Sequence, residues 1–154
     1  MVVRRSFTAL ITSLLVMAGL VLSAAGPARA ATRYGSFWVG YGQSYVQGTV
    51  SFFNQSVRFV GTVRATPGNC RAMEAATHTV NHGELDWTAD NYAAICASTT
   101  SLDKPFDFTL QANITGGASH IVVALYGHEA NDGLPYQPLT FACETYPNQG
   151  CTLP

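Results

Sequence analysis

The stretch HTVNHGELD, residues 78–86, holds the densest group of side chains that could do chemistry in this chain. His78 and His82 would share one face of an extended strand, and Glu84 and Asp86 would follow on the same side. Imidazole and carboxylate groups in such a row can bind a divalent metal ion. The alternative is a polar strand end that runs into a solvated loop. The H-E-x-x-H pattern is absent and a glycine is placed to turn the chain between the histidines and the acids, so the sequence predicts no metal site and no cofactor.

No serine of the chain has the sequence context of a catalytic nucleophile. The G-x-S-x-G elbow that exposes the nucleophile of many hydrolases does not occur. A glycosidase would need two carboxylates that face each other across a cleft, and a chain this short has little room for both a core and an enclosed cleft. The sequence therefore predicts a protein that is not an enzyme.

The segment RYGSFWVGYGQSYVQG, residues 33–48, is rich in aromatic residues separated by glycine. One interpretation is a core strand. A second is a platform on which sugar rings stack. The third is a protein-binding segment, because aromatic side chains supply a large contact area and glycine lets an extended segment lie close to a partner's backbone. The candidates for protein contact are Tyr34, Phe37, Trp38, Tyr41 and Tyr45.

The first thirty residues have the pattern of a signal peptide. A basic start precedes an apolar run from Ala9 to Gly26, and Ala28 and Ala30 supply the small residues that a signal peptidase recognises. An uncleaved membrane anchor is the alternative, which the small-residue site disfavours. We therefore expect a secreted protein. Its predicted organisation is a signal peptide at 1–30, an aromatic and glycine-rich segment at 31–48, and a β-sandwich domain at 49–154.

The charge balance of the exported chain limits its partners. After removal of residues 1–30, five basic residues remain against nine acidic ones, a net charge of −4. A chain without a basic patch is a poor partner for nucleic acid or for an anionic membrane surface. We expect the partner to be another secreted protein, with a glycan as the alternative.

The cysteines at positions 70, 96, 143 and 151 all follow the predicted cleavage site. An even number of cysteines in an exported chain indicates disulfides rather than a zinc site, and three pairings are possible. We favour Cys70–Cys96 and Cys143–Cys151, because neighbours in sequence close the smaller loops.

Alternating polarity with a period of two dominates the rest of the chain and predicts strands. Val46, Val50 and Phe52 share one face of residues 45–53, and a short polar turn leads to a second alternating strand at 57–65, which together predict a hairpin. Further strands are expected at 71–80, 92–99, 105–114, 120–127 and 139–146. About seven short strands without an amphipathic helix predict an all-β, antiparallel β-sandwich of immunoglobulin-like size, with a closed barrel as the alternative.

Three features resemble one group of secreted bacterial proteins. They are the signal MVVRRSFTALITSLLVMAGLVLSAAGPARA, the aromatic and glycine-rich segment, and the disulfide-bearing β-domain behind it. In size, export and layout, the chain resembles the small β-rich bridging subunit of actinobacterial umbrella toxin particles. This resemblance implies an adaptor that grips its partner with an extended strap and belongs to an extracellular assembly such as an antibacterial toxin complex.

Two other binding functions stay open. A carbohydrate-binding module would stack sugars on Trp38, Tyr41 and Trp87. A small secreted protease or glycosidase inhibitor would present the loop closed by Cys143 and Cys151, in which proline limits the flexibility. For the adaptor, we expect the core of the domain to be complete without its aromatic segment.

Overall fold

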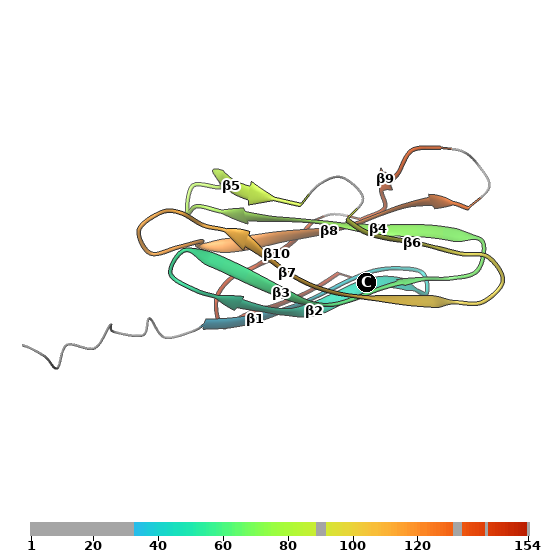
Figure 1. The fold of residues 1–154 in the computed structure, drawn as a ribbon, viewed down its shortest axis with the longest axis horizontal. Coiled ribbons are helices and arrows are strands. Elements are labelled where there is room, and N and C mark those ends of the chain that lie inside the picture. Colours follow the sequence, from blue (N-terminus) through green and yellow to red (C-terminus); the bar gives the residue numbers. More distant parts are fainter. Residues whose placement is uncertain (1–32, 89–91, 131–133, 141, 154) are drawn as a thin grey trace, which may run out of the picture. The chain divides into compact units, whose positions relative to one another are not determined.

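Two layers of β-sheet make up the part of the chain that the structure describes (Figure 1). This computed structural model describes residues 33–88, 92–130, 134–140 and 142–153, and the predicted signal peptide at 1–30 lies outside them. The described residues form eleven strands. They contain no helix, and so none that could cross a membrane. The prediction of an all-β fold with antiparallel sheets is confirmed.

One layer, sheet A, has five strands. In spatial order they are β11 (Gly150–Leu153), β1 (Arg33–Tyr41), β2 (Ser44–Phe52), β3 (Ser56–Ala65) and β7 (Leu102–Gln111). All neighbours are antiparallel except β11, which runs parallel to β1. The predicted hairpin is present as β2 and β3.

The other layer, sheet B, has six strands built around a central pair. The central pair is β4 (Asn69–His78) and β8 (His120–Glu129), which pair along their whole length. The outer strands are β5 (Glu84–Trp87), β6 (Tyr92–Ala97), β9 (Gln137–Pro138) and β10 (Cys143–Thr145). Two of them, β5 and β9, lie outside the stretches that the sequence predicted as strands.

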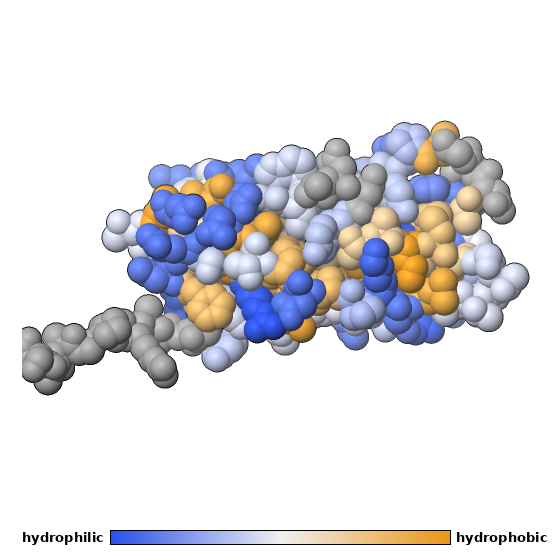
Figure 2. Space-filling view, in the orientation of Figure 1, coloured by the Kyte–Doolittle hydropathy of each residue, from blue (hydrophilic) through white to orange (hydrophobic). Residues whose placement is uncertain are grey.

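The core lies between the sheets and follows from the alternation along each strand. Val39, Val46 and Phe59 of sheet A and Ile121 and Leu125 of sheet B are fully buried. Figure 2 shows apolar side chains in a band between the two layers, with hydrophilic side chains on either side. Burial of the apolar side chains between the two sheets is the main favourable contribution to folding.

Two phenylalanine rings meet in this core above a pair of glycines. Phe37, Gly48, Gly61 and Phe106 lie opposite one another on four adjacent strands. The two rings are stacked with their centroids 6.4 Å apart. A Cβ atom on Gly48 would lie 2.8 Å from Cζ of Phe37, and one on Gly61 would lie 2.6 Å from Cζ of Phe106. The glycines therefore provide the space that the rings occupy.

The predicted boundary between residues 48 and 49 does not hold in the structure. Residues 31–154 form one unit, in which β1 lies between β2 and β11 and pairs with both. Phe37 and Val39 of β1 belong to the core. Because backbone pairing and inward side chains both hold β1 in place, the aromatic segment is part of the sandwich, and the expectation of a core complete without it is wrong.

Both predicted disulfides are present. Cys70 and Cys96 lie directly opposite each other on β4 and β6, within sheet B. Cys143 of β10 and Cys151 of β11 join sheet B to sheet A. The second disulfide therefore fixes the position of the parallel strand β11 against the opposite layer.

We expect Gly61→Val to destabilise the fold by about 3 kcal/mol or more, because its side chain must displace the Phe106 ring and the backbone of β2. The control is Thr62→Val at the next position, because threonine and valine have nearly the same shape and this side chain points away from the core. The control should lower the free energy of unfolding by less than about 1 kcal/mol. Urea unfolding measures both. Equal stability of the two variants would contradict this packing.

We expect removal of the disulfides to lower the free energy of unfolding by different amounts. Their sequence separations are 26 and 8 residues. Loop entropy then predicts a loss of about 3–4 kcal/mol for the Cys70/Cys96 double alanine variant and about 2–3 kcal/mol for the Cys143/Cys151 variant. Urea unfolding at equal protein concentration measures both. The reverse order would show that holding the two sheets together outweighs loop entropy.

Candidate functional site

The structure separates the five aromatic residues predicted to make protein contact. Phe37 is only 3% exposed and belongs to the core, so its prediction as a contact residue is wrong. Tyr34 is 61% exposed and Tyr41 is 51% exposed, at opposite ends of β1. Trp38 and Tyr45 are half-buried. The segment therefore has no single aromatic surface.

Trp38 and Tyr45 pack against each other, with ring centroids 6.3 Å apart. The Trp38 indole covers Gly40, where a Cβ atom would collide with it. The Arg64 guanidinium lies 6.0 Å from the centre of the Tyr45 ring and is bonded to Asp103. The outward-facing rings of Trp38 and Tyr45 thus pack on Gly40 and on each other. The inward-facing ring of Phe37 packs on Gly48 in the same way.

Tyr41 borders the larger of two cavities that residues of the aromatic segment line, whereas Phe37 and Trp38 line the smaller one. The larger cavity has a volume of about 720 Å³ and mostly apolar walls. Volumes of this size are typical of pockets that bind small molecules. We call it the edge cavity; it is lined by Tyr41, Ala124, Tyr126, Pro138, Leu139, Thr140, Ala142 and Leu153.

Strands of both sheets position these walls. Leu153 is brought to Tyr41 by the parallel pairing of β11 with β1, in which Leu153 lies opposite Val39. Pro138 of β9 lies opposite Tyr126 of β8. Five of the eight lining residues therefore lie on strands, and the other three, Leu139, Thr140 and Ala142, lie in the connection between β9 and β10.

Polar groups at the edge cavity are few. The Thr140 Oγ1 atom is buried and has no hydrogen-bond partner within the described residues. The Arg71 guanidinium lies 5.9 Å from the centre of the Tyr41 ring. A ligand that fits this site is an apolar group that also hydrogen-bonds the threonine hydroxyl, because a buried hydroxyl without a partner is costly.

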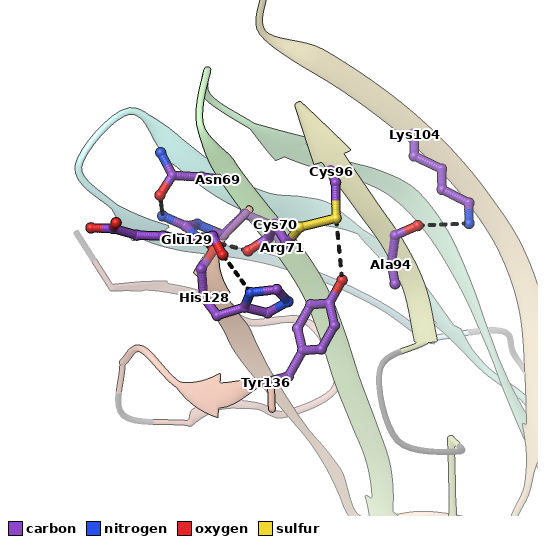
Figure 3. The surroundings of a disulfide bond; sticks show 9 residues. All are labelled: Asn69, Cys70, Arg71, Ala94, Cys96, Lys104, His128, Glu129 and Tyr136. Carbon is purple, nitrogen blue, oxygen red and sulfur yellow. Dashed lines mark hydrogen bonds between the residues drawn. A yellow bond between two sulfur atoms is a disulfide. The ribbon is translucent and has the colours of Figure 1, made fainter. Parts of the chain in front are cut away.

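Arg71 is buried beside the Cys70–Cys96 disulfide (Figure 3). Its guanidinium donates hydrogen bonds to the carbonyl oxygen of Cys70 at 2.7 Å and to Oδ1 of Asn69 at 2.9 Å. Burial lowers the pKa of Arg71, while Tyr41 and Tyr136 act in the opposite direction. Arginine still keeps its proton at neutral pH, so the positive charge of Arg71 lies over the face of the Tyr41 ring.

The four residues of the HTVNHGELD stretch do not form the row of ligands that the sequence suggested. The Asp86 carboxylate instead accepts hydrogen bonds from the backbone N–H groups of Gln111 and Trp87. Glu84 lies on β5. His82 lies beside His120 of β8, a residue that the sequence analysis did not single out, with ring centroids 4.8 Å apart. Pairing of β4 with β8 brings these two histidines together, although they are far apart in the sequence. The spacing of residues within one segment could not indicate this contact.

The structure also places the residues of the two alternative functions. Trp38 lies in sheet A and Trp87 in sheet B, and Tyr41 lies at the edge cavity, so the three do not form one stacking platform for sugar. The loop closed by Cys143 and Cys151 is bonded along β1, because Ser36 N–H donates to the Gln149 carbonyl and Asn148 N–H donates to that of Tyr34. This loop pins the C-terminal strand to the sheet.

No protein-family model, no curated protein and no solved structure matches this chain. A function for it is therefore inferred from its own residues.

We expect the edge cavity to bind an apolar fluorescent dye such as anilinonaphthalene sulfonate in the native protein. Ala124→Leu places extra carbon atoms in the cavity and should weaken dye binding about tenfold, which corresponds to about 1.4 kcal/mol. Thr109→Leu adds an apolar side chain at an exposed position of β7 and should leave binding unchanged. Equal dye affinity of both variants would show that the dye binds elsewhere.

Proposed function

We propose that this chain is a secreted, non-enzymatic binding protein that acts as a subunit or adaptor of an extracellular protein assembly. The observation that carries the proposal is the edge cavity, with apolar walls on strands of both sheets. The two disulfides are consistent with an extracellular location. In this proposal the cavity receives an apolar side chain of the partner protein next to Tyr41, and a polar atom of the partner's backbone hydrogen-bonds the Thr140 hydroxyl.

The walls of the cavity favour a protein partner over a glycan. Its lining side chains are mainly aliphatic or aromatic, and Thr140 supplies a polar group in the wall. A sugar presents hydroxyl groups around its ring, and each one buried without a partner costs free energy. An apolar side chain instead gains by leaving water, and buried aromatic or aliphatic anchors dominate the affinity of most protein interfaces.

The adaptor role rests on the resemblance in size and predicted export to the bridging subunit of umbrella toxin particles. The contact proposed here differs from an extended strap, because the segment 33–48 is built into sheet A. The partner would instead dock at the edge where β1, β8 and β9 meet, with Tyr41 in the interface.

Affinity capture with the secreted chain tests this proposal. The chain and its Ala124→Leu and Thr109→Leu variants are immobilised and exposed to the culture supernatant of the source organism. We expect the parent and Thr109→Leu to retain the same protein at stoichiometric amounts, and Ala124→Leu to lose it. Retention that is equal for all three chains, or that is removed by treating the supernatant with glycosidases, would contradict a protein partner at the edge cavity.

A further inference from the structure

Three histidines, a glutamate and a tyrosine meet at one end of sheet B, away from the edge cavity. His78 and His120 lie directly opposite each other on β4 and β8. His82 belongs to the turn that follows β4, and Glu144 lies on β10. We call this group the histidine cluster: His78, His82, His120, Glu144 and Tyr146.

Three of these side chains are close enough to hold one ion. Ligand atoms of His82, His120 and Glu144 all lie within 4.8 Å of one another. His82 Nδ1 and Glu144 Oε1 are 3.9 Å apart. Ligands of a tetrahedral zinc ion lie about 3.3–3.4 Å apart, given metal–ligand bonds of about 2.0–2.1 Å. His82 and Glu144 are exposed, so small side-chain rotations are enough to close the difference.

His120 carries the decisive atom of the histidine cluster. Its side chain is fully buried, and its Nε2 atom has no hydrogen-bond partner within the described residues. Its other ring nitrogen, Nδ1, lies 2.9 Å from the Ser119 hydroxyl. That hydroxyl donates its proton to the His78 carbonyl at 3.0 Å. It must therefore accept the proton of Nδ1, which assigns the free lone pair of the neutral ring to Nε2.

Burial and the neighbouring His78 lower the pKa of His120, while Glu144 acts in the opposite direction. A buried ring nitrogen that has a lone pair and no hydrogen donor is costly unless another group fills the position. Metal-binding histidines characteristically donate their second N–H to a fixed oxygen, which orients the ring. Ser119 supplies that oxygen here.

Two more residues hold the exposed ligands in place. His78 lies with Nδ1 3.1 Å from the backbone carbonyl of His82, across the turn. His82 itself has a positive φ of 58°, a strained conformation for a residue with a side chain, which tends to occur at functional sites. The Tyr146 hydroxyl donates a hydrogen bond of 3.3 Å to Glu144 Oε2 and leaves Oε1 to face His82.

From this geometry we infer that the histidine cluster is a zinc site with His82, His120 and Glu144 as ligands and one coordination position open. Two imidazoles and one carboxylate suit Zn²⁺ among divalent ions, whereas Ca²⁺ and Mg²⁺ prefer oxygen ligands throughout. The bound ion would join the turn after β4 to β8 and β10. The open position can take water or a donor atom of a partner. This site is independent of the proposed function at the edge cavity.

Zinc titration of the tag-free secreted chain, after removal of metal with a chelator, tests this inference. Isothermal titration with zinc chloride should show one Zn²⁺ per chain with micromolar or tighter affinity. His82→Ala and Glu144→Gln change exposed residues and should keep the fold, yet weaken binding by at least about 100-fold. His120→Ala should weaken zinc binding by a similar factor if it folds. If it does not fold, the zinc affinities of His82→Ala and Glu144→Gln test the inference.

Matched controls come from the same chain. His128→Ala removes a histidine outside the cluster, and Glu84→Gln removes a nearby carboxylate outside the ligand set. Both should bind zinc as the parent does. Cobalt in place of zinc should give the strong visible absorption of a four-coordinate ion in the parent and lose it in His82→Ala. Less than one ion bound per chain at micromolar zinc, or equal losses in His82→Ala and His128→Ala, would overturn the inference.

Discussion

The packing of two phenylalanine rings over two glycines is the constraint on which the sandwich depends. Phe37 and Phe106 approach each other only because Gly48 and Gly61 carry no side chains between them. This contact sets how sheet A presents its inner face to sheet B, since protein interiors are packed too densely to absorb an added methyl group without a shift. The same contact makes β1 part of the core, because β1 supplies the Phe37 ring.

The C-terminal stretch from β9 to β11 depends in turn on β1. It crosses from sheet B to sheet A, and the Cys143–Cys151 disulfide and the parallel pairing of β11 hold it there. One part of this stretch lines the edge cavity, and another part carries Glu144 to the histidine cluster. Both proposed sites therefore require β1 to be in place, although neither is formed from the aromatic segment alone.

Much of the fold could be predicted because its signals are local. Period-two alternation predicted the β2–β3 hairpin, and short sequence separation predicted both disulfides. The role of the aromatic segment could not be predicted from the sequence. An aromatic residue that packs on a glycine of the same or the next strand gives the same sequence pattern as an exposed aromatic residue that binds another protein. Trp38 packs on Gly40 and Phe37 packs on Gly48, both within the fold.

The candidate sites were harder to predict for a related reason. His120 lies 42 positions after His78 in the sequence and directly opposite it in the sheet, so only strand pairing reveals the cluster. Tyr41 was predicted as a contact residue and does border the edge cavity. The other walls come from β8, β9 and β11 and from the connection between β9 and β10, and the sequence did not specify how these segments pair. Metal ligands and cavity walls of this kind come from non-local pairing.

Amide hydrogen exchange of β1 distinguishes a structural strand from a detachable segment. We expect the amides of Phe37 and Val39 to exchange only through global unfolding, with the same free energy as the amides in the middle of β4 and β8. Exchange of these β1 amides through a local opening of much lower free energy, while β4 and β8 stayed protected, would show that the segment is a detachable strap and not a structural strand.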